Sequence, residues 1–255
     1  KLASMRLLLR HELNKLKVYD VDSPPSVMAT LTTGQKLNDD GTPIPGTGFE
    51  YESDGVVAEL LEQRIGPIVS QPITGEWIIP LVDGKENNGE FGRAIVIFSP
   101  GNLGPPEHFH PNYVETFEII SGDFVFMVNG KEKRAGPGDK LTVEKGVRHG
   151  WRCVGEEYGV VIGEAWPQAR IAEVVSTLFG MAHEGKLTKK GQPKFLHAML
   201  IGREYSDDTV FTSPPPFISS FLTMVFAPLA RLLGYKATEP RYLENSFWEK
   251  HVNQP

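Results

Sequence analysis

One short segment constrains this 255-residue chain more than any other feature: residues 108–115 read His-Phe-His-Pro-Asn-Tyr-Val-Glu, and His149 follows further along. Side chains alternate across a β-strand, so His108 and His110 fall on the same face of one strand. The intervening Pro-Asn pair then bends the strand, which resets the alternation and can bring Glu115 to the two histidines. Three imidazoles and a carboxylate that converge from different strands are ligands for iron, manganese, nickel, zinc or copper. The sequence therefore predicts one divalent metal ion, with these four residues as ligands.

Short runs of strand character and tight turns surround these residues. The pair Asn129-Gly130 separates the runs 124–128 and 131–133, and such a pair signals a hairpin because both residues tolerate positive φ. Further runs are rich in branched and aromatic residues, which suit a half-buried sheet; they cover residues 77–79, 94–98, 116–120, 141–143 and 158–165. The pattern predicts a mainly β fold that closes into a small barrel, with room for side chains and one small ligand.

The first histidine segment resembles the first motif of the cupin family, which reads G-x5-H-x-H-x3-4-E-x6-G. Residues 108–122 match its two histidines, its glutamate and its final glycine. Asn102 occupies the position of the initial glycine. The resemblance implies the cupin jelly-roll, a double-stranded β-helix barrel that holds its metal ion through these residues.

The segment around His149 resembles the second cupin motif, G-x5-P-x-G-x2-H-x3-N. Gly146 and His149 fit the motif, whereas Glu144 replaces its proline and Cys153 its asparagine. These departures affect turn and barrel positions and leave the ligands intact. The resemblance covers about residues 90–165. A cupin that had kept its fold and lost its metal would usually lack one or more ligands, and this chain has all four.

Two further ionisable side chains lie close to the predicted ligands in sequence. Glu118 is a rival to Glu115, but it lies three residues further along the same strand and should point to the opposite face. Tyr113 and Glu118 are, with Glu115, the candidates for acid or base catalysis. The remaining histidines are interpreted as surface or core residues; they are His11, His183, His197 and His251.

The predicted lining of the barrel is apolar and aromatic. Phe117 and Ile119 share the strand face of the predicted carboxylate ligand, and Trp151 shares the face of the third histidine. With Phe126 on the neighbouring run, these residues predict a substrate pocket. Such a pocket suits a phenolic, polyketide or terpenoid compound and is a poor site for a sugar phosphate.

Residues 1–70 are predicted to form an N-terminal extension or arm. Leucine spacing indicates short helices over residues 5–17 and 56–63. Residues 19–50 are rich in Pro, Gly, Asp and Thr without periodicity, which predicts a long loop. This loop either wraps a neighbouring subunit, covers the barrel mouth or forms a disordered leader.

Residues 71–166 are predicted to form the cupin β-barrel, and residues 167–255 a C-terminal helical extension. Helical periodicity is clear over residues 171–182, and residues 217–233 are the most apolar stretch of the chain. That stretch is too short and too interrupted for a transmembrane helix, which needs roughly 20 residues. We expect it to pack on the barrel or in a dimer interface; a lid and a membrane-surface contact are the alternatives.

Composition narrows the partners of the chain. A formal net charge of −6 argues against a nucleic-acid partner, which would require a basic face. The single cysteine cannot form an intrachain disulfide, and no signal peptide is apparent, so we expect a cytoplasmic protein. Barrel edges, the arm and the apolar C-terminal helix all require burial, which favours a homodimer.

Four protein ligands leave coordination positions open for water, oxygen or a chelating substrate. The resemblance to cupins implies either an oxygenase or a redox-neutral lyase, isomerase or cyclase, and fold alone does not choose between them. The sequence favours a metal-dependent oxidoreductase of the dioxygenase type, which acts on a hydrophobic small molecule in secondary metabolism. The alternatives are redox-neutral chemistry and a cupin that binds a small molecule without catalysis. A storage protein is disfavoured, because that group usually carries two barrels.

Overall fold

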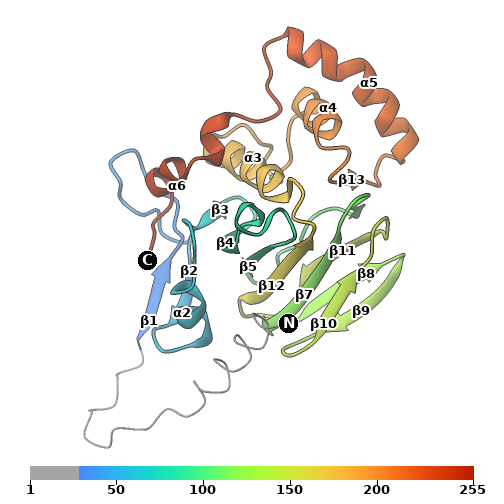
Figure 1. The fold of residues 1–255 in the computed structure, drawn as a ribbon. Coiled ribbons are helices and arrows are strands. Elements are labelled where there is room, and N and C mark those ends of the chain that lie inside the picture. The colour runs from blue at the N-terminus through green and yellow to red at the C-terminus, as the bar shows by residue number, and fades with distance from the viewer. Residues whose placement is uncertain (1–28) are drawn as a thin grey trace, which may run out of the picture.

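Two antiparallel β-sheets that face each other form the centre of the computed structural model, which describes residues 29–255 (Figure 1). The helix predicted over residues 5–17 lies outside the described residues. One sheet has the strand order β10-β7-β12-β5-β4-β3, and the other has the order β13-β6-β11-β8-β9. The fold is mainly β with helices in the C-terminal part, as predicted, and its two facing sheets have the jelly-roll architecture.

The strands of the two sheets can be compared with the runs predicted from the sequence. The first sheet contains β3 (Val69–Gln71), β4 (Glu76–Val82), β5 (Gly92–Phe98), β7 (Val114–Ser121), β10 (Lys140–Val143) and β12 (Gly159–Trp166). The second contains β6 (His108–Phe109), β8 (Phe124–Val128), β9 (Lys131–Ala135), β11 (His149–Cys153) and β13 (Val210–Phe211). The predicted hairpin is confirmed: β8 pairs with β9, and Asn129 and Gly130 in the turn have φ of 48° and 74°.

The six-stranded sheet buries apolar side chains on both of its faces. One face meets the second sheet, where Phe98 contacts Phe124 edge-on at 5.6 Å between ring centroids. The other face carries Trp77 and Ile79 into a core shared with helix α3 (Ile171–His183). Burial on both faces explains why β5 reads as a continuous apolar run and not as an alternating one.

The N-terminal part contains a two-stranded sheet that the sequence did not predict. Strand β1 (Thr30–Thr33) pairs with β2 (Phe49–Glu52), so the prediction of an unbroken loop over residues 19–50 is wrong for β1. Both strands are four residues long, and contacts with distant residues hold them: the indole of Trp77 donates to the carbonyl of Gly34 and contacts the ring of Phe49. The predicted helix that follows is confirmed as α2 (Val56–Leu61).

The C-terminal helices gather at one end of the barrel (Figure 1). They are α3, α4 (Phe195–Glu204), α5 (Pro216–Leu232) and α6 (Asn245–His251); the 3-10 helices η1 and η2 span Gly84–Asn87 and Pro240–Leu243. Helix α5 packs against α4 through Ala227, Ala230 and Leu200, which are fully buried. Other side chains of α5 are exposed, among them Phe217 and Phe221. Within residues 29–255, no helix combines the length and apolar character needed to cross a membrane.

Candidate metal centre

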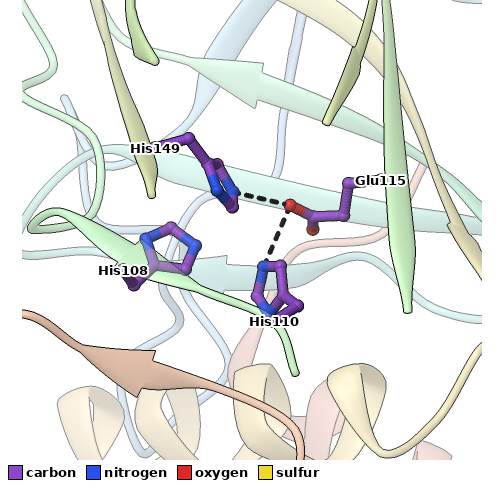
Figure 2. A group of neighbouring side chains, drawn as sticks. All are labelled: His108, His110, Glu115 and His149. Carbon is purple, nitrogen blue, oxygen red and sulfur yellow. Dashed lines mark hydrogen bonds and ion pairs between the residues drawn. The ribbon is translucent and has the colours of Figure 1, made fainter. Parts of the chain in front are cut away.

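His108, His110, Glu115 and His149 come together at one end of the barrel, and their ligand atoms all lie within 4.8 Å of one another (Figure 2). His108 in β6 pairs directly with His149 in β11, whereas Glu115 extends from β7 of the facing sheet. The three imidazoles are buried. The cluster therefore joins both sheets, and its donor set could hold a metal ion.

Each of the three imidazoles forms a hydrogen bond between its Nδ1 atom and a backbone carbonyl. The Nδ1 of His108 lies 2.9 Å from the carbonyl of Pro106, and the Nδ1 of His149 lies 3.0 Å from that of Val147. The Nδ1 of His110 lies 2.8 Å from the carbonyl of Asp208. A carbonyl oxygen can only accept, so each contact requires a proton on Nδ1. The Nε2 atom of each neutral ring is then free to bind a metal, as is usual for histidine ligands.

The charges around Glu115 favour a cation. Burial opposes ionisation of Glu115, but hydrogen bonds with His110 and His149 outweigh burial, and the pKa of Glu115 lies well below its usual range. One of its carboxylate oxygens lies 3.0 Å from the Nε2 of each of these two histidines. If both rings are neutral, these contacts set nitrogen lone pairs against an anion. Two imidazolium ions would resolve the conflict, and so would a single divalent cation of the same total charge.

His108 and Tyr113 complete the electrostatics of the cluster. Burial and the neighbouring His149 lower the pKa of His108 to about 3, so its imidazole is neutral at physiological pH. The ring of Tyr113 stacks on that of His110 at 4.1 Å between centroids, and its hydroxyl lies 3.4 Å from His110 Nε2. Burial and the charge of Glu115 raise the pKa of Tyr113 far above its usual value. Tyr113 is therefore a neutral phenol that can donate a hydrogen bond.

The structure does not bring Glu118 to this cluster. Its carboxylate forms an ion pair with Lys140, at 3.0 Å, and the Glu118 side chain is 40 % exposed. The alternation of side chains along β7 places it on the face opposite to Glu115, as the sequence indicated. A role of Glu118 as an acid or base next to the metal ligands has no support in this geometry.

The four residues predicted to line a pocket lie between the two sheets. Phe117 contacts Trp151 at 5.0 Å and Phe126 at 5.3 Å between ring centroids, and Ile119 is buried beside them. Trp151 stacks against the imidazole of His149 at 6.1 Å. These side chains pack on one another next to the ligand cluster and belong to the core between the two sheets.

Sequence reasoning missed the residues of the C-terminal part that contact the cluster. Strand β13 pairs with β6, and the ring of Phe211 lies 5.9 Å from that of His108. Asp208 and Thr209, which directly precede β13, both contact the imidazole of His110. These residues lie about a hundred positions from the ligand that they contact, in a stretch that carries no recognisable motif. No local signal could have placed them at the site.

The chain matches a family model and a curated relative. Residues 94–162 match the family model described as a cupin domain. A protein of Arthrobotrys oligospora, named as an oxidoreductase, is 28% identical over 151 residues, which make up 54% of this chain and 59% of that protein. The chain therefore matches about three fifths of the length of this curated relative.

Two solved structures illustrate the similarity. An RmlC-like cupin of Shewanella frigidimarina is 24% identical, with a TM-score of 0.35, and the match covers 42% of this chain and 87% of the other. The cupin domain of Cnp3 from Schizosaccharomyces pombe is 13% identical, with a TM-score of 0.36, over 57% of this chain and 91% of the other. The residues matched by the family model contain all four members of the cluster. The match to the family model identifies residues 94–162 of this chain as a cupin domain.

Proposed function

We propose that this protein is a metal-dependent enzyme in which His108, His110, Glu115 and His149 hold one divalent ion. The observation that carries the proposal is the common orientation of the three imidazoles. Each donates a hydrogen bond from Nδ1 to a backbone carbonyl, which leaves Nε2 available to a metal. When bound, the ion supplies Lewis acidity toward a substrate that binds through an enolate or hydroxyl oxygen. Iron, manganese, nickel, zinc and copper all accept imidazole ligands.

We assign the reaction to the oxidoreductases, with a dioxygenase as the favoured type and a phenolic, polyketide or terpenoid compound as the substrate. The name of the Arthrobotrys oligospora relative supports the reaction class. The ring of Phe211, a residue that is 38% exposed, lies 5.9 Å from that of His108 and supplies an apolar contact near the ligands, which supports a hydrophobic substrate. Glu115 would orient the two histidines that it contacts, and Tyr113 would donate a hydrogen bond to a substrate oxygen.

A redox-neutral lyase, isomerase or cyclase is the second candidate, and Tyr113 is the observation that favours it. The raised pKa keeps this buried phenol protonated, so its hydroxyl, 3.4 Å from His110 Nε2, can donate a hydrogen bond to an enolate oxygen that forms beside the ligand cluster. A dioxygenase consumes molecular oxygen during turnover, whereas a redox-neutral enzyme does not.

The experiment that tests the proposal is elemental analysis of protein purified without chelators. We expect one metal ion per chain in the wild type and in the control variant His197→Ala, because His197 lies on α4 outside the cluster. His110→Ala should lose the ion. Oxygen uptake with phenolic and enolic compounds then separates the two enzyme classes. A wild-type protein that stays empty after addition of each candidate metal would contradict the proposal and favour a non-catalytic binding protein.

A further inference from the structure

The segment 206–212 between α4 and α5 lies directly against the candidate metal centre, and we call it the strap. It is attached to the barrel on both sides of His110. The amide of Thr212 donates to the carbonyl of Glu107 at 3.0 Å, and its hydroxyl donates to the Glu107 carboxylate at 2.6 Å. The side chain of Asn112 donates to the carbonyl of Asp207 at 2.8 Å. The strap therefore spans the ligand-bearing segment and keeps its own backbone at a fixed distance from it.

The strap supplies the backbone carbonyl that accepts a hydrogen bond from Nδ1 of His110. For the other two histidines, the barrel supplies this carbonyl. His108 and His149 each direct Nδ1 at a carbonyl two residues earlier in the same segment. His110 instead directs Nδ1 at the carbonyl of Asp208, 98 positions away, with the hydroxyl of Thr209 at 3.3 Å. The orientation of His110 thus depends on the helical C-terminal part of the chain.

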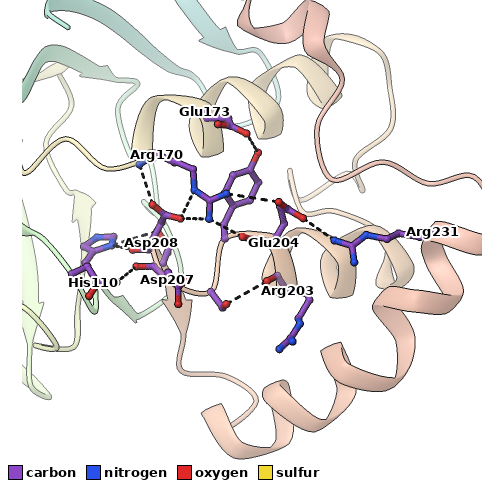
Figure 3. A network of polar contacts seen from close by, with 12 residues as sticks. His110, Arg170, Glu173, Arg203, Glu204, Asp207, Asp208 and Arg231 are labelled. Carbon is purple, nitrogen blue, oxygen red and sulfur yellow. Dashed lines mark hydrogen bonds and ion pairs between the residues drawn. The ribbon is translucent and has the colours of Figure 1, made fainter. Parts of the chain in front are cut away.

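An ion pair with the partly exposed Arg170 holds Asp208 in place (Figure 3). Its carboxylate accepts hydrogen bonds from the backbone amide and the Nε of Arg170, both at 3.0 Å, and lies 2.7 Å from Nη2. Arg170 immediately precedes α3; its guanidinium donates to the carbonyl of Glu204 on α4 and lies over the ring of Tyr205. The Asp208 side chain is 6 % exposed. Two helices therefore fix the residue whose carbonyl faces His110.

We propose that Arg170 and Asp208 are positioning residues that fix the imidazole of His110 in the orientation and tautomer that a metal ligand needs. This inference rests on the metal site proposed above. Without Arg170, the strap loses the partner of its buried carboxylate and the Asp208 carbonyl can move away from Nδ1. His110 then exchanges between its two tautomers. The tautomer that carries its proton on Nε2 has no lone pair on that atom with which to bind the ion. Loss of such an outer hydrogen-bond partner typically lowers metal affinity 10–100-fold.

Arg170→Met tests the proposal, with Arg241→Met as a matched control. Arg241 also pairs with a partly buried carboxylate, that of Glu184, at 2.6 Å, and lies over the ring of Tyr242. Zinc affinity is measured by competition with a chromogenic chelator. We expect roughly a tenfold loss for Arg170→Met, at the lower end of the range for such partners, and no change for Arg241→Met. Equal affinities for the wild type and Arg170→Met, or equal losses in the two variants, would overturn the proposal.

Imidazole nitrogen NMR of the metal-free protein reports the tautomer of His110. A general loss of stability would not change this tautomer in the folded protein. In the wild type, His110 should show a single tautomer with its proton on Nδ1, whereas Arg170→Met should show a mixture. Asp208→Asn, which keeps the shape of the side chain, is the second variant if Arg170→Met fails to fold. A wild type that binds no metal but shows the expected tautomers would refute the metal site and leave the positioning role standing. An unchanged tautomer in both variants would refute the positioning role.

Discussion

Three buried imidazoles share one arrangement in this protein, in which a carbonyl oxygen faces Nδ1 and Nε2 is turned toward the centre of the cluster. For His110 and His149, that Nε2 lies against the carboxylate of Glu115. If all three rings are neutral and no cation is bound, the Nε2 lone pairs of His110 and His149 face the anionic carboxylate, which is unfavourable in a buried site. A metal ion that binds only the folded state should therefore stabilise the protein.

Saturation with zinc is expected to raise the melting temperature. At a free ion concentration of 100 times Kd, binding contributes about 2.7 kcal/mol, and for a chain of this size that corresponds to about 5–10 °C. Differential scanning calorimetry with zinc and with EDTA measures the shift. His110→Ala, which lacks one of the four ligands, should show a much smaller shift; an equal shift would place the bound zinc elsewhere.

The carboxyl of Glu76 predicts a pH dependence of stability that is independent of the metal. Burial raises its pKa from 4.5 to about 7, so the folded state binds a proton more tightly than the unfolded state does. The stability that this proton contributes is complete below pH 4.5 and is lost as the pH rises through 7. Because the side chain is only partly buried, we expect Glu76→Gln to be more stable than the wild type by about 1 kcal/mol at pH 8.

Urea unfolding at pH 4.5 and pH 8 checks this expectation. The difference between Glu76→Gln and the wild type should be largest at pH 8 and small at pH 4.5. Glu90, which is exposed, provides the control Glu90→Gln. A variant that is less stable than the wild type at pH 8 would mean that the ionised carboxylate of Glu76 makes a favourable interaction.

At the scale of elements, strand β11 depends on a close approach of the loop before β6. Gly104 has a φ of 64°, and a Cβ atom there would overlap the carbonyl oxygen of Trp151. Trp151 lies two residues after His149 on β11. A shift of β11 that relieved the overlap would therefore displace His149, one of the proposed metal ligands.

Gly104→Ala is expected to destabilise the fold by roughly 2–4 kcal/mol, since strain from positive φ and a backbone overlap combine. Zinc affinity should fall as well. Gly101→Ala is the matched control: Gly101 has a φ of 71° with open space around its Cβ position, so only the backbone strain of about 1–2 kcal/mol applies. Chemical unfolding and chelator competition measure both effects. Similar losses in the two variants would show that the contact with Trp151 is unimportant.

The elements that could be predicted from the sequence are those with a local signal. The β8–β9 hairpin follows from Asn129-Gly130, and the predicted helix over residues 171–182 corresponds to α3, which follows from apolar spacing. Strands β6 and β13 are two residues long and exist because they pair with each other and β6 with β11. Such pairing depends on the whole chain and leaves no pattern within either segment.

The residues of the candidate site also divide into those with a sequence motif and those without one. The two motifs were sufficient to group the four residues of the cluster, because the motif spacing reflects strands that are neighbours in the barrel. Arg170 and Asp208 could not be predicted, since a lone arginine and a lone aspartate are ordinary surface residues in a sequence. Their proposed role depends on a fold that buries Asp208, pairs it with Arg170 and places the Asp208 carbonyl at His110.

At the scale of the whole molecule, the exposed apolar side chains of α5 are the surface that the predicted homodimer would bury. The exposed fraction of the residue is 76% for Phe217, 60% for Phe221 and 84% for Leu232. An apolar patch of this kind on a folded protein usually marks an interaction site. The homodimer stays a prediction, and α5 gives it a testable location.

Phe217→Ser combined with Phe221→Ser should shift the protein from dimer to monomer, with little loss of stability because both side chains are exposed. Sedimentation velocity across a range of concentrations measures the assembly state. Leu103→Ser is the control, since Leu103 is 81% exposed on a barrel loop and lies outside α5. A wild type that sediments as a monomer at every concentration would contradict the prediction.

The strap lies outside residues 94–162, the part of the chain that matches the cupin model, although it contacts a residue of the ligand cluster. The four cluster residues and the strap thus lie in separate parts of the chain. Substitutions after residue 167 can alter the strap while all four proposed metal donors are preserved. A gene fragment that stopped there would encode all four donors and still lack the acceptor that orients His110.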